Sequence, residues 1–325
     1  MRRTGFLYDQ QYLLHDTGPY HPERAERLMA IHQGLKRTGL LPQLISVPAR
    51  RAELRWIRTT HSDAYIRRFE ERCLAGHRTL DCEDNQMCPE TWEAALMAAG
   101  GVMEAARMLM AGEIDNAFCA VRPPGHHAEN GEAMGFCYFN NVAIAARYLQ
   151  QELGIERVGI IDFDVHHGNG TQHSFEEDPT VFYYSIHQHP SFTYPGTGRE
   201  FETGKGAGRG FTKNSPILPG QSDDVYQLML EQDLLPAFAS FKPQVIIAST
   251  GFDAHKDDEM ADMRLTDEGY AWIMRTIVAM ADRHCEGRLL SVLEGGYALE
   301  RLPELGAAHV RILLETPSDG APTIP

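Results

Sequence analysis

Acidic and imidazole side chains recur at short spacing in the stretch DFDVHHGNG. Asp162, Asp164 and His166 occupy alternate positions after an apolar run, so an extended strand would point all three to one side. Carboxylates beside a hydrophobic core are costly unless a cation or hydrogen bonds compensate them. The stretch GFDAH repeats the pattern with Asp253 and His255. One histidine and two carboxylates with an open fourth position favour a catalytic Zn²⁺ or a related divalent ion, and the alternative is a charged network that caps strand ends.

Two further motifs contain groups that could act on a substrate. His126 and His127 lie side by side in a loop of prolines and glycines, where paired histidines are often only solvated polar residues. In LEGGY, Gly295 and Gly296 allow a sharp turn that delivers Tyr297 to the end of an apolar run, although such a tyrosine is more often a packing residue. The glycine loop GKGAGRG follows no strand and opens no helix, so it does not indicate a phosphate site.

The motifs follow short apolar runs rich in β-branched residues, which indicate buried strands of a parallel sheet. Between these runs the pattern predicts helices over 90–112, 141–154, 222–241 and 266–285, with Ser222 and Thr266 as N-caps. Strand and helix in alternation predict an α/β fold with a central, mostly parallel sheet and helices on both faces. Ligands of such folds bind outside the carboxyl ends of the strands, so motifs far apart in sequence could converge there.

Length and composition are those of an ordinary globular protein of 325 residues with 43% hydrophobic and 23% charged residues. No linker-like stretch separates the motifs from one another, which favours a single catalytic domain over 1–315. The last residues, 316–325, have the composition of a flexible tail. No apolar run approaches the roughly 20 residues of a membrane span.

The net charge indicates the kind of partner, and the N-terminus and the cysteines indicate the cellular compartment. The net charge of -15 argues against nucleic acid and favours cationic partners. The N-terminal residues lack the apolar segment of a secretory signal, so we expect the mature chain to begin there. Six cysteines form no CxxC pair, which fits a reduced, cytoplasmic protein.

Seven motifs in order together resemble the zinc-dependent histone deacetylase superfamily. They are HPERAERL, RPPGHHA, GFCYFNN, DFDVHHGNG, YPGTG, GFDAH and LEGGY, and they span nearly the whole chain. Asn169 and Glu294 make the chain resemble the class II and bacterial histone deacetylase-like amidohydrolase branch. Class I members typically have Asp in place of Asn169 and Gly in place of Glu294. The resemblance implies an arginase-like fold.

The resemblance also implies roles for individual residues. Zn²⁺ would be held by Asp164, His166 and Asp253. His127 would be the general base and then the general acid, oriented by Asn169. His126, paired with Asp162, would stay an electrostatic partner, and Tyr297 would donate to the oxyanion.

A channel and one or two structural K⁺ ions follow from the same resemblance. The residues matched to the substrate channel and its rim are Gly135, Phe136, Tyr194, Met260 and Asp84, the last of which is equally well a solvated loop carboxylate. One K⁺ would lie near the zinc, bound mostly by backbone carbonyls of Asp162, Asp164, His166, Ser185 and Ile186. A second K⁺ would lie near Phe175, Asp178, Val181 and Phe211.

The sequence therefore predicts a zinc-dependent deacylase acting on acylated lysine of proteins or peptides. An acetylpolyamine amidohydrolase is the nearest alternative: Met260 at the rim argues for lysine, whereas the acidic residues around it and the net charge would also attract polyamines. A catalytically inactive zinc module that binds acylated ligands is less consistent with a complete set of catalytic residues. A manganese ureohydrolase would need a second set of bridging carboxylates, which we cannot place. The sequence does not indicate the oligomeric state.

Overall fold

A computed structural model describes residues 1–315, so the tail predicted for 316–325 lies outside the described residues. The fold is an eight-stranded sheet in the order β2-β1-β5-β10-β9-β6-β7-β8, and every neighbouring pair is parallel. The strands are β1 (Thr4–Leu7), β2 (Ile45–Val47), β5 (Asn116–Cys119), β6 (Val158–Asp162), β7 (Val181–Gln188), β8 (Thr212–Ile217), β9 (Val245–Thr250) and β10 (Leu289–Leu293). A separate antiparallel pair is formed by β3 (Thr79–Leu80) and β4 (Cys82–Gln86).

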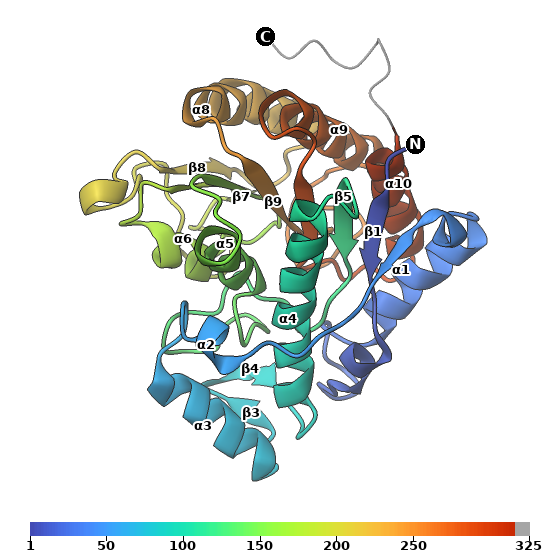
Figure 1. The fold of residues 1–325 in the computed structure, drawn as a ribbon, viewed down its shortest axis with the longest axis vertical. Coiled ribbons are helices and arrows are strands. Elements are labelled where there is room, and N and C mark those ends of the chain that lie inside the picture. Colours follow the sequence, from blue (N-terminus) through green and yellow to red (C-terminus); the bar gives the residue numbers. More distant parts are fainter. Residues whose placement is uncertain (316–325) are drawn as a thin grey trace.

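Helices cover both faces of the sheet, which confirms the predicted α/β class (Figure 1). The helices are α1 (Glu26–Arg37), α2 (Leu54–Ile57), α3 (Asp63–Leu74), α4 (Thr91–Met110), α5 (Asn141–Gln151), α6 (Asn169–Phe175), α7 (Asp223–Met229), α8 (Leu235–Phe241), α9 (Asp267–His284) and α10 (Leu302–Leu314). Three short 3-10 turns cover Gln10–Leu14, Leu41–Gln43 and Gly206–Gly208. One group, α1, α10, α9 and α7, packs together, and α4 with α5 belongs to another. None of the described helices is long and apolar enough to cross a membrane.

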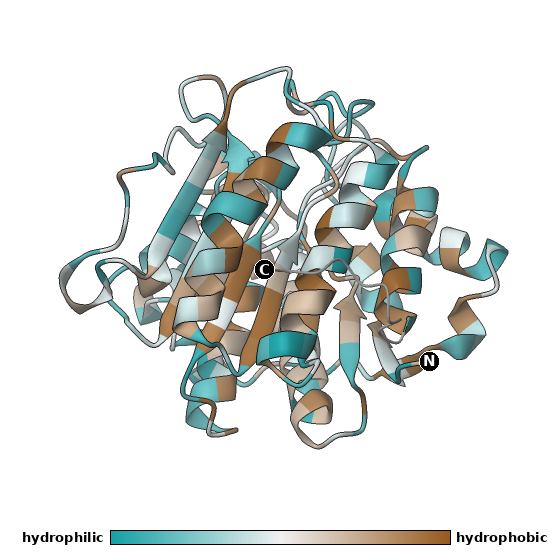
Figure 2. Ribbon diagram, turned by 90° about the horizontal axis from the view of Figure 1, so that it is seen from above, coloured by the Kyte–Doolittle hydropathy of each residue, from teal (hydrophilic) through white to brown (hydrophobic). Residues whose placement is uncertain are grey.

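The central strands are rich in apolar residues because helices bury both of their faces. Every residue of β6, β9 and β10 is buried. Figure 2 shows hydrophobic strands at the centre of the molecule and many hydrophilic residues on the helices and loops around them. The three strands are neighbours in the sheet, so the loops that follow them share one edge.

Local signals explain where the predicted helices begin. The Thr266 side chain accepts a hydrogen bond from the Gly269 amide and caps α9, and Asn140 caps α5 in the same way. Ser222 precedes α7, but its side chain makes no capping hydrogen bond. The helix predicted over 222–241 is divided by a π turn, Leu230–Leu234, which comes just before Pro236. A proline inside a helix lacks the amide donor and crowds the preceding turn, which explains the local irregularity.

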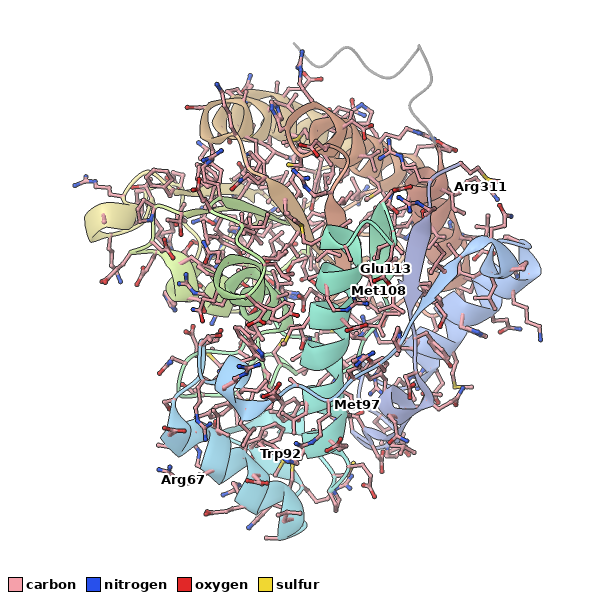
Figure 3. All side chains as sticks on the ribbon, viewed as in Figure 1. Arg67, Trp92, Met97, Met108, Glu113 and Arg311 are labelled. Atoms are coloured by element: carbon pink, nitrogen blue, oxygen red, sulfur yellow. The ribbon has the colours of Figure 1, made fainter. Side chains whose placement is uncertain are left out.

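A second apolar cluster lies beside the main core, between α3 and the start of α4. Trp92, labelled in Figure 3 at that end of α4, packs edge-on against Phe69 at 5.2 Å and against Phe139 at 5.6 Å. Phe139 belongs to the segment that follows the histidine pair. The cluster therefore anchors the loop that bears His126 and His127.

Candidate active site

Three buried side chains from two loops form a group of metal-ligand type. The ligand atoms of Asp164, His166 and Asp253 all lie within 4.8 Å of one another. His166 Nδ1 is 3.2 Å from an oxygen of Asp164 and 3.3 Å from an oxygen of Asp253. Atoms bound at about 2.0–2.2 Å to a tetrahedral ion lie roughly 3.3–3.6 Å apart, so the spacing suits one small cation.

Backbone hydrogen bonds, rather than strand alternation, orient these ligands. β6 ends at Asp162, so the expected extension of one strand face through Asp164 and His166 is wrong. Instead Asp164 Oδ1 accepts from the His166 amide at 2.9 Å. Asp253 Oδ1 accepts from the Val165 amide at 3.0 Å, which joins the loop after β9 to the loop after β6.

One carboxylate oxygen of the cluster lacks the partner that its burial demands. Asp253 Oδ2 is buried and accepts no hydrogen bond, and its contact with His166 Nδ1 is too poorly aligned to be one. Burial, together with the nearby charge of Asp164, raises the pKa of Asp253 to about 7. An unsatisfied buried carboxylate is expensive unless a cation lies beside it. The residues present therefore fit a divalent metal ion.

The LEGGY turn lies directly over the same carboxylates. The Gly295 amide donates to Asp164 Oδ2 at 2.8 Å. A Cβ on Gly295 would lie 2.1 Å from Asp253 Oδ2, so only glycine allows this close approach. Gly296 has a φ of +113°, a conformation that side chains with a Cβ rarely adopt, and it carries the chain on to Tyr297.

His255 does not belong to this group, although its motif placed it beside Asp253. Its ring is buried, and Nε2 lies 2.9 Å from Asp267 Oδ1 at the start of α9. The chain turns after Asp253, which sends His255 away from the ligands. It connects two elements of the scaffold.

The two adjacent histidines have different partners and opposite protonation behaviour. His126 Nδ1 lies 3.0 Å from Asp162 Oδ2, and His127 Nδ1 lies 2.8 Å from Asn169 Oδ1. Burial opposes protonation of His126, but Asp162 and Asp164 outweigh it and raise the pKa of His126 to about 10. Burial and the neighbouring imidazoles hold the pKa of His127 well below its ordinary value. These surroundings thus favour the protonated form of His126 and the neutral form of His127.

A pocket of about 150 Å³ opens above the metal-ligand group. Its lining residues are Asp84, His127, Gly135, Phe136, His166, Tyr194, Met260 and Tyr297, which include every residue that the sequence assigned to the channel. We call Asp164, His166, Asp253, His126 and His127 the floor, and Asp84, Tyr194 and Met260 the rim. Burial raises the pKa of Tyr297 well above its ordinary value, which keeps its hydroxyl protonated as a donor.

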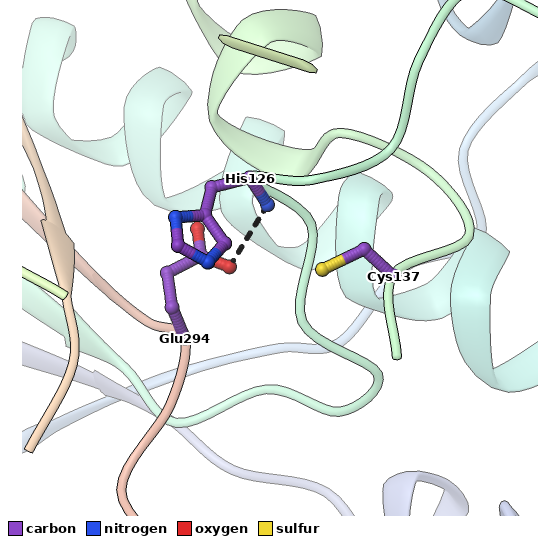
Figure 4. Close-up of side chains that lie close together, drawn as sticks. All are labelled: His126, Cys137 and Glu294. Atoms are coloured by element: carbon purple, nitrogen blue, oxygen red, sulfur yellow. Dashed lines mark hydrogen bonds between the residues drawn. The ribbon is translucent and has the colours of Figure 1, made fainter. Parts of the chain in front are cut away.

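A second group of ligand-type side chains, His126, Cys137 and Glu294, lies under the histidine loop (Figure 4). The Glu294 carboxylate accepts from the Gly125 amide at 2.7 Å, from the His126 amide at 3.1 Å and from the Ser249 hydroxyl at 3.1 Å. Burial raises the pKa of the Cys137 thiol well above its ordinary value, so no thiolate is offered. This group is satisfied by hydrogen bonds, and we assign it to positioning the loop.

Sequence reasoning missed a buried ionic network behind Tyr297. Arg27 donates to the carbonyls of Glu294 and Gly296, each at 2.6 Å, and its guanidinium lies 4.8 Å from the centre of the Tyr297 ring. Glu23 binds Arg27 at 3.0 Å. Glu23 lies three residues before α1, so its four-residue spacing from Arg27 in HPERAERL does not reflect a shared helical face, and no simple sequence signal marked this pair.

Arg122 joins this network from the other side. Its Nε donates to Glu23 at 2.5 Å, and both side chains are completely buried. The positive charges of Arg122 and Arg27 overcome the opposing effect of burial and hold the pKa of Glu23 well below its ordinary value. The network joins the loop before His126 to the turn before Tyr297.

The residues matched to potassium sites lie beside β6, β7 and β8. Asp162 and Ser185 are register partners on β6 and β7, so the first set is close together. Near the second set, Arg147 donates to Asp178 at 2.5 Å and places its guanidinium 4.6 Å from the Phe175 ring. This fixed positive charge opposes a further cation there.

Comparison with known proteins agrees with this geometry. Residues 21–313 match the histone deacetylase domain. A protein of Archaeoglobus fulgidus described as a probable deacetylase is 41% identical over 299 residues, which cover 91% of this chain and 82% of that protein. The histone deacetylase-like amidohydrolase of Pseudomonas aeruginosa is 35% identical over 329 residues, which cover 96% of this chain and 86% of that protein.

Solved structures agree as well. The crystal structure of the HDA15 HD domain superimposes with a TM-score of 0.90 at 34% sequence identity, covering 97% of this chain and 91% of that one. Its likeness bears out the predicted arginase-like α/β fold. The chain therefore belongs to the histone deacetylase family.

Proposed function

We propose that this member of the deacetylase family is a zinc-dependent hydrolase that removes acetyl or other acyl groups from lysine side chains. The observation that carries the proposal is the unsatisfied buried carboxylate of Asp253, which lies with Asp164 and His166 beneath a pocket that His127 and Tyr297 also line. Hydrolysis of an unactivated amide needs an electrophile, a base and an oxyanion donor, and these residues supply all three functions.

Asp164, His166 and Asp253 would hold the ion. When bound there, Zn²⁺ would polarise the substrate carbonyl and make a water molecule more acidic. Two carboxylates and one imidazole leave part of the coordination sphere open, as in catalytic rather than structural zinc sites.

The protein side chains would divide the proton transfers between them. Neutral His127 accepts a proton from the attacking water and later returns it to the leaving amine. His126, protonated beside Asp162, contributes a fixed positive charge. The Tyr297 hydroxyl donates to the oxygen that gains negative charge, and the Arg27 network holds the backbone on either side of that residue's turn.

The shape of the pocket favours an acylated lysine. Phe136 and Tyr194 give it aromatic walls that suit a methylene stem, and Met260 adds a flexible apolar surface at the rim. An acetylated polyamine is the second candidate, because Asp257 and Glu259 flank Met260 with exposed carboxylates and Asp84 lines the same opening. A second amine of such a substrate would be attracted to these charges.

Several accompanying assignments belong to the same proposal. Residues 1–315 act as one catalytic domain. One K⁺ lies beside Asp162, Ser185 and Ile186. The positive charge of Arg147, which binds Asp178, disfavours the second K⁺. The cysteines are all free, which fits a cytoplasmic location.

The proposal is tested by metal removal and a side-by-side substrate panel. Protein stripped with a chelator should lose turnover of an acetyl-lysine peptide, and added Zn²⁺ should restore it. Acetyl-lysine peptides, longer acyl-lysine peptides and acetylated polyamines should then be compared at equal concentrations. Full activity in demonstrably metal-free protein would exclude the zinc mechanism, and a preference for polyamines would change the substrate class.

A further inference from the structure

Glu129, two residues after His127, lies at the back of the candidate base. Its side chain is only 20% exposed, although its loop is rich in polar residues. Its backbone is held on both sides: the amide donates to the Glu132 carbonyl at 2.9 Å, and the carbonyl accepts from His61 Nδ1 at 2.8 Å. The carboxylate is therefore presented from a fixed position.

That carboxylate contacts the residue that orients His127. Asn169 donates from Nδ2 to Glu129 Oε1 at 2.5 Å and, more weakly, to the His127 carbonyl at 3.3 Å. Its other amide atom, Oδ1, lies 2.8 Å from His127 Nδ1. One end of the amide thus faces two oxygen acceptors, and the other end faces the imidazole.

The two ends of an amide are similar in size but opposite in hydrogen-bonding character. If the amide of Asn169 were flipped, its oxygen would face the Glu129 carboxylate and the His127 carbonyl, and both contacts would become repulsive. With the observed orientation, Oδ1 is an acceptor, so His127 Nδ1 must carry its proton. The lone pair is then on Nε2, the only ring nitrogen left to accept a proton.

A second donor keeps the Glu129 carboxylate in place. His173 Nδ1 lies 2.7 Å from the same Oε1, and this hydrogen bond raises the pKa of His173. His173 is half-exposed on α6. The four side chains therefore form a continuous chain from the buried base to the surface.

We propose that Glu129 is a positioning residue that selects the Nδ1-protonated tautomer of His127 by fixing the amide of Asn169. The effect of Glu129 on kcat rests on the proposed hydrolase activity, whereas its effect on the tautomer of His127 does not. The alternative is that the Glu129 and His173 pair merely stabilises the loop. The two readings differ in what they predict for the tautomer and for a compensating variant.

Removing the carboxylate should lower kcat while leaving KM within about twofold, because Glu129 does not line the pocket. Glu129→Ala should reduce kcat about 10- to 100-fold, the usual range for a residue that orients a site ligand. Glu129→Gln should retain most of the activity, since its amide oxygen can still accept from Asn169. Glu132→Ala removes an exposed carboxylate from the same loop and serves as the control, with kcat unchanged.

A pair of compensating substitutions distinguishes a role of Glu129 in orienting Asn169 from a role in stabilising the loop. Asn169→Asp alone should be severely impaired, because it places a second carboxylate against Glu129. Glu129→Ala combined with Asn169→Asp should be more active than either single variant, since a carboxylate presents only acceptors to His127 and needs no orienting partner. A double variant no better than the worse single variant would overturn the proposal.

The tautomer itself provides a readout that does not depend on turnover. In ¹⁵N-histidine-labelled protein, His127, assigned by its loss in His127→Gln, should show a protonated Nδ1 and an unprotonated Nε2. In Glu129→Ala this pattern should be lost or mixed, and an unchanged pattern would overturn the proposal. If the wild type turned over no acylated substrate, the proposed function would fail, while the nitrogen spectra would still decide the role of Glu129.

Discussion

The floor of the pocket is buried and tied to the backbone, whereas its rim faces solvent, with Asp84 on β4 and with Tyr194 and Met260 on loops. Asp164 and Asp253 are each 1% exposed, and each accepts a backbone amide. Tyr194 is 39% exposed, and Asp84 is exposed as well. We therefore expect the floor to fix the chemistry and the rim to select the substrate, so changes in the two regions should affect different kinetic constants.

Asp258 is the point at which the two regions meet. Its carboxylate accepts from the Met260 amide at 3.0 Å and from the Tyr297 amide at 2.6 Å. A rim residue and the candidate oxyanion donor, Tyr297, are thus held by one buried side chain. Predictions that separate floor from rim should therefore use side-chain changes that leave this backbone contact intact.

The largest effect is expected from His127→Ala, which removes the candidate base from the floor. Loss of general acid and base catalysis should reduce kcat about 1000-fold. KM for an acetyl-lysine peptide should change little. Steady-state kinetics on the zinc-loaded variant check this, and a change confined to KM would assign His127 to binding instead.

Tyr297→Phe should be nearly as severe. Loss of one oxyanion donor costs roughly 100- to 1000-fold in kcat. The ring and its contact with Arg27 are retained, so binding should be preserved. The outcome that contradicts this role is a normal kcat with a raised KM.

Acidification should weaken a support of the loop that bears the histidine pair. His61 Nε2 accepts from the Asn140 amide at 2.9 Å, so the ring must be neutral. Burial lowers the pKa of His61 to about 4, below that of an unfolded chain. The unfolded state therefore binds the proton first as the pH falls, and the free energy of unfolding should decrease by up to about 3 kcal/mol between roughly pH 6.5 and pH 4.

Urea unfolding at several pH values measures this effect, with His61→Gln as the comparison. Glutamine can donate to one neighbour and accept from the other without titrating. The variant should lose part of the acid sensitivity. Equal pH slopes for the two proteins would show that His61 does not contribute.

The smallest effect is expected at the rim. Met260→Glu should raise kcat/KM for acetylated polyamines relative to acetyl-lysine peptides by about 1–2 kcal/mol, because the new carboxylate can attract a second amine. Asp257 and Glu259 nearby would blunt the change. Both substrates should be measured at the same moderate salt concentration. A constant ratio would mean that Met260 does not select substrates.

Sequence patterns predicted the parts of this protein that repeat simple rules. Apolar runs marked β6, β9 and β10, and Thr266 marked the start of α9. Strand order followed no such rule: β5 lies beside β10, although the two strands are far apart in the chain. Pairing of distant strands depends on tertiary packing that periodicity does not encode.

Sequence patterns likewise predicted part of the candidate site and missed another part. Motif resemblance pointed to Asp164 and Asp253, which the structure brings together, but equal spacing also suggested His255, which turns away to Asp267. Glu129 was not singled out, because a charged residue in a polar loop normally faces water. Its role depends on an amide that comes from another segment of the chain.

The parallel pairing of β6 with β9 has a consequence for how the candidate metal site forms. The hydrogen bond from Val165 to Asp253 joins residues 88 positions apart, so the ligand set exists only after a long loop has closed. Contacts of such separation tend to form late, after most of the apolar surface is buried. The ion should then bind a nearly native chain: Zn²⁺ should slow unfolding markedly and leave the refolding rate almost unchanged.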